Sequence, residues 1–332
     1  MKGTGIIGYG ISRLRRAALT LGAVLLLQNV TAAAAVSLAD DRGRTLVFAA
    51  PAQRIVTLAP HLAEIVFAAG AGGRLVGVAR FSDFPEAAAR LPQVGDGSRV
   101  DPERILALRP DLILAWKTGN QASDVARLEQ LGFPVFVTEP ARLADIPRLV
   151  RAVGMLAGTA RVAEQTNEEF DKKINALRES YGGRPPLRVF YEIWHRPLLT
   201  VNGRHMISDV IDLCGGRNVF ADAPVLTPLV SEEAVLAAQP DVILGGGSAG
   251  GEKEFVAQWR ASAVKSLREL PRFFVDPDEI QRQTPRIVGG AKAVCEDLEK
   301  VRKRKFSRQG RHEIQKNKIE PPRPPSTPRK TK

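Results

Sequence analysis

Short apolar runs alternate with amphipathic segments along residues 36–144. A short apolar run is typical of a buried strand, and apolar residues at every third or fourth position are typical of a helix. We therefore predict strands at 54–58, 75–78, 112–115 and 134–137. The same reasoning predicts helices at 61–69 and 121–131, and a hairpin over 36–48 that turns at Gly43. Strands that alternate with helices indicate a mainly parallel α/β sheet.

The pattern changes between residues 143 and 181, where strand signals are nearly absent. One helix is predicted at 145–156, and a second begins at Thr159 and continues to Tyr181. The 23 residues of this second helix span roughly 35 Å, about the width of a domain. A helix of that length can join two lobes and hold their separation nearly fixed.

A second α/β lobe follows, with strands predicted at 187–192 and 273–275 and a final helix at 285–300. Beyond residue 303 lysine, arginine and proline dominate, which predicts a disordered basic tail. The predicted division is a signal peptide at 1–35, an N-terminal lobe at 36–144, connecting helices at 145–183, a C-terminal lobe at 184–302 and the tail at 303–332.

One segment of the first lobe recurs 130 residues later in the second. Residues 101–116 align with 231–246 without a gap, and seven of the 16 positions are identical. Each copy has an acidic helix start, a short apolar helix, a Pro-Asp break and a buried strand. Because one such unit cannot bury its own apolar face, two copies indicate two similar lobes. We predict two Rossmann-like lobes with mainly parallel sheets, joined by one long helix, with a ligand cleft between the strand ends.

Charge separates the ends of the chain from its body. Of the net charge of +12, segment 1–35 carries +4 and segment 301–332 carries +10, which leaves about −2 on residues 36–300. A nucleic-acid-binding protein needs its positive charge on the folded surface. The distribution therefore excludes nucleic acid as a partner, and we expect a monomer.

The N-terminus has the features of a secretory signal. Arg13, Arg15 and Arg16 precede an apolar run at 17–27, and small residues at 31–35 offer cleavage sites. The alternative is a membrane anchor, but the run is shorter than the roughly 20 residues that a spanning helix needs. No cysteine lies near the cleavage point, which argues against a lipid anchor. We predict a periplasmic protein.

Cys214 and Cys295 are the two cysteines of the chain. An exported chain with one possible pair is expected to form a disulfide, and two separate buried thiols are the alternative. The bond would close a loop of about 80 residues and stabilise the fold by roughly 4 kcal/mol.

Four segments carry a resemblance to a known family: 54–60, 81–85, 102–116 and 214–220. They resemble the periplasmic substrate-binding proteins with a helical backbone, which serve ABC importers of iron-siderophores, haem and cobalamin. Within that group the chain is most similar to the cobalamin carriers, through Trp116 with Gly119-Asn120, the Phe81-to-Pro85 loop and the cysteine pair. The resemblance implies a corrinoid held between the lobes as transported ligand, no catalytic cofactor, and a permease dimer in the inner membrane as partner.

The resemblance also implies roles for Glu103 and Glu233, which occupy the same place in the two repeats. Family members pair such residues with arginines of the permease dimer, whereas the alternative is a favourable charge at a helix start. Glu232 is adjacent to Glu233 and could substitute for it.

Ligand contacts are predicted at strand ends and in loops, at Phe81, Trp116, Trp194, Arg196 and Arg282. Large planar ligands need flat apolar partners, which tryptophan and phenylalanine supply. Core packing is the alternative for both tryptophans, and for Phe84 and Trp259 it is the preferred interpretation. Arg282 matches a family arginine, but Glu279 and Ile280 stand where cobalamin carriers have an aromatic residue.

The sequence has no arrangement of nucleophile and base, and its four histidines lack metal-ligand spacing, so we predict neither catalysis nor a metal site. His61 and His195 could reach the metal of a ligand axially. The alternatives to a corrinoid carrier are a ferric-siderophore or haem carrier, an exported enzyme on the same scaffold, and a sensor subunit whose liganded form is read by a partner.

Overall fold

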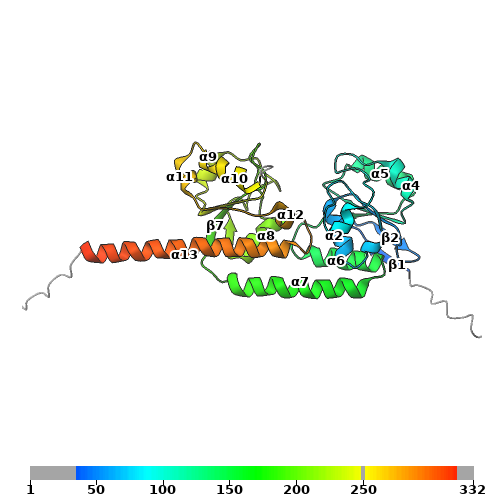
Figure 1. Ribbon diagram of the computed structural model, residues 1–332, viewed down its shortest axis with the longest axis horizontal. Helices are drawn as coiled ribbons and strands as arrows, with labels where there is room; N and C mark the ends of the chain where they lie inside the picture. Colours follow the sequence, from blue (N-terminus) through cyan, green and yellow to red (C-terminus); the bar gives the residue numbers. More distant parts are fainter. Residues whose placement is uncertain (1–34, 248–250, 320–332) are drawn as a thin grey trace, which may run out of the picture.

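The computed structural model describes residues 35–247 and 251–319, with side chains to Lys305 and at Ser307. Residues 1–34 of the predicted signal peptide lie outside this part. Two α/β lobes sit on the same side of two long helices (Figure 1). None of the described helices is both long enough and apolar enough to cross a membrane.

Each lobe contains one four-stranded sheet in which all strands are parallel. The N-terminal sheet has β3 (Ile55–Thr57), β4 (Leu75–Gly77), β5 (Leu112–Trp116) and β6 (Val135–Thr138), in the order β4-β3-β5-β6. The C-terminal sheet has β7 (Leu187–Glu192), β8 (Gly216–Asn218), β9 (Val242–Gly245) and β10 (Arg272–Phe274), in the order β8-β7-β9-β10. In both lobes the first strand lies between the second and the third, so the lobes share one topology. This confirms the predicted fold class.

Helices surround both sheets, and a hairpin precedes the first. The N-terminal lobe has β1 (Val36–Ala39), β2 (Thr45–Phe48), α2 (Pro60–Ala68), the 3-10 turn η1 (Gly72–Arg74), α3 (Glu86–Ala89), α4 (Pro102–Leu108) and α5 (Ala122–Gln130). The C-terminal lobe has α8 (Met206–Leu213), α9 (Glu232–Ala237), α10 (Gly251–Arg260), α11 (Lys265–Glu269) and α12 (Pro277–Ile280). The three- and four-residue elements β8, α3 and α12 were missed by the sequence analysis because they are shorter than the window that periodicity needs.

The sequence repeat forms the same structure in both lobes, as α4 with β5 and as α9 with β9. A non-glycine residue with left-handed backbone follows each helix: Arg109, at φ 48°, comes directly after α4, and Gln239, at φ 44°, comes two residues after α9. Arg54 and Arg188 lie near the start of the first strand of each lobe. Arg54 donates hydrogen bonds to the carbonyl oxygens of Leu108 and Arg109 at the end of α4, and Arg188 donates to those of Ala238 and Gln239, the two residues that follow α9. These donors satisfy carbonyl groups that a helix end leaves unpaired.

The connection between the lobes is helical. α6 (Asp145–Leu156) ends at Gly158, whose φ of 64° suits glycine, and α7 (Ala160–Tyr181) then runs beneath both lobes beside α13 (Ile287–Ile319) (Figure 1). The 22 residues of α7 span about 33 Å. The predicted long helix is therefore present, with the predicted C-terminal end.

One prediction about the C-terminus is wrong. The sequence pattern predicts that the last helix ends at residue 300 and that disorder begins at 303, but α13 continues to Ile319 and projects beyond the C-terminal lobe (Figure 1). Residues 301–319 contain no proline and are rich in lysine, arginine and glutamine, which have high helix propensity. Residues 320–332 lie outside the described part.

A continuous core joins the lobes. Alternate residues of a strand face opposite sides of its sheet. Leu114 of β5 and Leu244 of β9 face the same large cluster, while Ile113 and Ile243 face two smaller clusters on the outer sides. The large cluster also includes buried residues of α6, α7, α8 and α13. Packing, as well as chain connection, therefore holds the two lobes on their helices.

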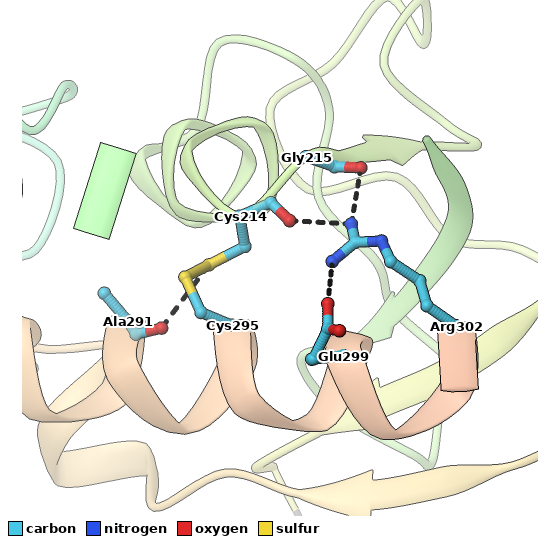
Figure 2. The surroundings of a disulfide bond; sticks show 6 residues. All are labelled: Cys214, Gly215, Ala291, Cys295, Glu299 and Arg302. Carbon is cyan, nitrogen blue, oxygen red and sulfur yellow. Dashed lines mark hydrogen bonds and ion pairs between the residues drawn. A yellow bond between two sulfur atoms is a disulfide. The ribbon is translucent and has the colours of Figure 1, made fainter. Parts of the chain in front are cut away.

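The predicted disulfide is present between Cys214, at the end of α8, and Cys295 in α13 (Figure 2). Beside it, the buried Arg302 donates hydrogen bonds of 2.8 and 2.9 Å to the carbonyl oxygens of Cys214 and Gly215. The disulfide and Arg302 together fasten α13 to the C-terminal lobe.

Removal of the disulfide is expected to lower the free energy of unfolding by about 4 kcal/mol, because its loop spans 81 residues. Urea denaturation of the wild type with and without dithiothreitol measures this difference. The variant Cys214→Ser with Cys295→Ser is the control, since reductant should leave it unchanged. Equal midpoints for the oxidised and reduced wild type would contradict the prediction.

Candidate functional site

The candidate ligand site lies at the carboxyl ends of the strands. In a sheet of this topology ligands bind where the strand order switches, between the first and third strands. Trp116 ends β5 at one switch point, and Trp194 lies two residues after β7 at the other. The two predicted tryptophans thus occupy corresponding edges of the two lobes.

Trp116 is half-buried at the edge of the large core cluster. Its ring lies over Gly119, where a Cβ would overlap it. Asn120 joins the two strands of the switch point: its Oδ1 accepts from Trp116 N at 2.7 Å, and its Nδ2 donates to Leu58 O at 2.8 Å. This explains the Gly119-Asn120 pair, which fixes the strand end at which a ligand would meet the indole.

His61 packs behind Trp116. The ring centroids lie 5.1 Å apart in an edge-on arrangement, and His61 is 4% exposed. Burial, with the charge of Arg282, lowers the pKa of His61 to about 3, so the imidazole is neutral at ordinary pH. The part of the chain that the structure describes also has no cluster of three or more His, Cys, Asp or Glu side chains placed to hold a metal ion.

The two phenylalanines of the loop after β4 are in different situations. Phe81 is 67% exposed and has a left-handed backbone at φ 67°, a strained conformation for a bulky residue. Phe84 is 45% exposed, and the guanidinium of Arg286 lies 4.0 Å from its ring centroid. Phe81, with the guanidinium of Arg80 5.9 Å from its ring centroid, is therefore the more open of the two, and Phe84 is stacked more closely.

Trp194 belongs to an exposed apolar surface on the C-terminal lobe. It is 47% exposed, and its Nε1 donates to Arg196 O at 2.9 Å. Antiparallel bridges pair Trp194 with Leu199 and Leu199 with Leu229. Because residues directly opposite in an antiparallel pair share a face, these three side chains form one strip. Arg196 is exposed at its edge.

The far side of this surface consists of residues that were not predicted from the sequence. Leu229 is 68% exposed, and Val225 and Leu226 of the same loop are 55% and 39% exposed. The signal was available in the apolar Pro-Val-Leu-Thr-Pro-Leu stretch at 224–229, which lacks strand or helix periodicity. Apolar residues in an irregular loop are unusual unless the loop meets a partner or ligand.

Beneath Trp194 lies a buried acid. Glu192 is fully buried at the end of β7 and accepts a hydrogen bond of 2.6 Å from Trp259 Nε1. Its carboxylate is 3.3 Å from Nδ1 of His195. Burial raises the pKa of Glu192. Trp259 is 1% exposed, in agreement with the predicted packing role.

Arg282 joins the two lobes. Its guanidinium contacts Glu64 at 2.9 Å and Asp83 at 2.7 Å in the N-terminal lobe, and Asp278 at 2.8 Å in its own lobe. The hydrogen bond from Arg282 holds the pKa of Asp83 below its ordinary value. These contacts bring the carboxyl-end loops of the two sheets together. The arginine predicted to bind ligand is therefore already compensated by three carboxylates.

Glu64 is the centre of this network and was not predicted. It is 4% exposed and also accepts from Thr284 Oγ1 at 3.0 Å and Arg286 Nη1 at 3.2 Å. The signal was a single acid among the apolar residues of α2. Its partners could not be inferred, since Arg282 is 218 residues away.

Glu103 and Glu233 are exposed near the N-terminal ends of α4 and α9. The caps are equivalent: Asp101 accepts from Arg104 N at 3.0 Å, and Ser231 accepts from Ala234 N at 3.2 Å. A hydrogen bond with Ser231 lowers the pKa of Glu233, so it is ionised at neutral pH.

The structure separates Glu233 from its neighbour. Glu232 is half-buried, and its carboxylate accepts a hydrogen bond of 2.5 Å from Ser262 Oγ. Glu233 therefore corresponds to Glu103, whereas the carboxylate of Glu232 is already hydrogen-bonded within its own lobe.

The sequence matches the family described as "Periplasmic binding protein" over residues 55–269. It is 33% identical over 255 residues to the vitamin B12-binding protein of Vibrio parahaemolyticus, an alignment that covers 77% of this chain and 92% of that protein. It is 35% identical over 250 residues to the vitamin B12-binding protein of Yersinia pestis, covering 75% and 88% of the two chains. The chain belongs to the periplasmic binding protein family.

Solved structures of periplasmic binding proteins have the same fold. The periplasmic vitamin B12 binding protein BtuF of Vibrio cholerae aligns with a TM-score of 0.67 and 36% identity, over 76% of this chain and 99% of that chain. The periplasmic heme-binding protein RhuT from Roseiflexus aligns with a TM-score of 0.65 over 75% and 98% of the two chains; at 24% identity it shares the fold.

Family membership gives the general activity. A periplasmic binding protein is not an enzyme; it binds a small-molecule ligand in the periplasm, carries no catalytic cofactor and has a permease as partner. In this binding protein the predicted ligand residues lie at two facing lobe edges, while the two glutamates lie on α4 and α9.

Proposed function

We propose that this protein captures cobalamin or a related corrinoid between its lobes and delivers it to an ABC importer. A corrinoid is a large, nearly planar ligand with amide side chains, which favours flat apolar walls with few fixed charges. Phe81 on one lobe and the strip of Trp194, Leu199 and Leu229 on the other offer such walls. Trp116 and Arg196 lie at the same edges.

The observation that carries the proposal is the charge balance around Arg282. A carrier of an anionic ferric siderophore needs a cation with its charge available to the chelate. Here Glu64, Asp83 and Asp278 already contact the guanidinium of Arg282, and its side chain is 15% exposed. Apart from the exposed Arg196, the large side chains named above that remain open at the two edges are apolar, which supports a corrinoid. We propose that Arg282 contributes to ligand binding in one of two ways. It contacts the ligand with one edge of its guanidinium, or it holds Asp278 in position.

Delivery is proposed to use Glu103 and Glu233 against basic residues of a permease dimer. Export is proposed to use residues 1–35 as a cleaved signal peptide, and the disulfide between Cys214 and Cys295 suits an oxidising compartment. We propose that the mature protein is a monomer with no nucleic-acid partner, since residues 36–300, which form its two lobes, carry a net charge of about −2.

Calorimetric titration tests the ligand. The mature chain is titrated with cyanocobalamin, with its incomplete precursor cobinamide, with haem and with one ferric hydroxamate siderophore. Tight one-to-one binding of a corrinoid alone is expected. A heat of binding observed only with haem or only with the siderophore would leave the family assignment unchanged and would overturn the corrinoid assignment.

Truncation of the exposed aromatics is expected to weaken corrinoid binding. Trp194→Ala and Phe81→Ala should each raise the dissociation constant on the order of 10- to 100-fold, because each removes a large rigid apolar contact. Val47→Ala is the control, since Val47 is 71% exposed on β2, away from both edges. Unchanged calorimetric affinity in both aromatic variants would contradict the proposed walls.

A further inference from the structure

The seven identities of the internal repeat divide into two groups. Four have structural roles within each lobe: Pro110, Asp111, Ile113 and Leu114 in one copy, and Pro240, Asp241, Ile243 and Leu244 in the other. The prolines, isoleucines and leucines are buried, and both aspartates accept hydrogen bonds from backbone N–H groups near the first strand. Packing and hydrogen bonding therefore account for these four pairs.

The other three identities are all exposed. They are Glu103, Leu106 and Ala107 on α4, and Glu233, Leu236 and Ala237 on α9. The leucines are 57% and 40% exposed. Residues at i, i+3 and i+4 share one face of a helix, so each lobe presents the same face of Glu, Leu and Ala to solvent. We call these two faces the paired triads.

Positions beside this face have diverged. Arg104 corresponds to Ala234, and Arg109 corresponds to Gln239. A single exposed leucine is ordinary on a protein surface. Two leucines at equivalent places, each one turn from an exposed glutamate and on a face that is otherwise unchanged, indicate a shared partner instead. The fold itself gives no reason for the match, because the opposite faces carry the buried Ile105 and Val235.

We propose that the paired triads are one docking surface, in which Leu106 and Leu236 enter equivalent apolar pockets of a two-fold symmetric permease. This proposal rests on the proposed function, and it adds the fit of two leucine side chains into apolar pockets to the charge pairs of the glutamates. Two identical patches on one chain fit a partner that offers the same site twice, as a homodimer does. Each permease half would present a cation for the glutamate and, one helical turn away, a shallow pocket for the leucine. Figure 1 places α4 and α9 on the parts of the lobes away from α7, where the connecting helices leave them open.

The test is Leu106→Ala with Leu236→Ala in the full mature protein. Affinity for the reconstituted permease–ATPase complex is measured by surface plasmon resonance, and affinity for cyanocobalamin by calorimetry. The permease dissociation constant is expected to rise about tenfold or more, while the corrinoid affinity stays unchanged. Val47→Ala is the control, since Val47 is 71% exposed on β2, away from α4 and α9 in Figure 1, and the change should leave both constants unchanged.

Salt separates the two contributions. The leucine defect should persist at about 0.5 M salt, whereas the contribution of the glutamates should fade, because exposed charges are screened. Leu106→Ala and Leu236→Ala alone should have similar effects, and an effect confined to one lobe would overturn the two-fold partner.

Other outcomes distinguish this inference from the proposed function. Unchanged permease affinity in the leucine variant, beside a large loss in Glu103→Ala with Glu233→Ala, would overturn the leucine pockets and leave the docking glutamates intact. Unchanged affinity in both variants would also remove the proposed docking. A wild-type dimer in analytical ultracentrifugation that the leucine variant abolishes would assign the triads to a second copy of this chain instead.

Discussion

Glu103→Ala combined with Glu233→Ala is expected to abolish corrinoid uptake while leaving corrinoid binding intact. The two glutamates lie on α4 and α9, whereas the proposed ligand walls lie at the carboxyl ends of the strands. Close charge pairs across protein interfaces have coupling energies of about 1.5–7 kcal/mol. Loss of two such pairs should weaken permease binding by about a hundredfold or more.

Uptake of labelled cobalamin in a strain that lacks its own binding protein measures the first effect, and calorimetry measures the second. Glu168→Ala with Glu169→Ala is the matched control, because it removes the same charge from exposed positions on α7. Glu232→Ala is a closer control, since Glu232 bonds to Ser262 within the lobe. Normal uptake by the Glu103 and Glu233 variant would show that docking uses other residues.

Glu64→Ala is expected to lower the free energy of unfolding by about 3–5 kcal/mol. The buried carboxylate is shared by Arg282, Thr284 and Arg286, and its removal leaves two partly buried guanidinium groups without their common acceptor. The same change loosens the contact between the lobe edges, so corrinoid affinity should also fall. Glu64→Gln should lie between the wild type and the alanine variant, because its amide keeps one acceptor.

Urea denaturation measures the stability change and calorimetry the affinity. Glu164→Ala serves as control: it breaks the pair with Arg151 on an exposed surface, where ion pairs contribute little, and should leave the unfolding midpoint almost unchanged. A Glu64→Ala variant as stable as the wild type would show that the network around Arg282 is dispensable for the fold.

The inter-lobe network changes the interpretation of Arg282. From the sequence, an arginine that matches a family position near a ligand was expected to bind the ligand directly. In the structure its charge is balanced by three carboxylates from both lobes, so its first effect is on how the lobe edges meet. A contribution to the ligand then depends on this arrangement, which Glu64→Gln disturbs without removing the arginine.

Local patterns in the sequence determined the order of the longer elements, the long helix that ends at Tyr181, the duplicated unit and the pairing of the cysteines. These features depend on hydrophobic periodicity, on turn residues and on a count of two cysteines, all of which can be observed within short segments. The same local reasoning failed at residues 303–319, where charge predicted disorder although helix propensity is high and proline is absent.

Tertiary structure alone decided which side chains meet. It bonded Glu232 to Ser262 and left Glu233 exposed. It also placed Glu64 against Arg282 from 218 residues away, joined Leu229 to the surface of Trp194, and left the paired triads exposed. The reason is physical: the burial and charge balance of a side chain depend on neighbours brought close by packing between segments far apart in the chain. A sequence pattern can identify a residue as chemically suited to a role. Whether its side chain is exposed or already bonded to a neighbour is decided by the folded structure.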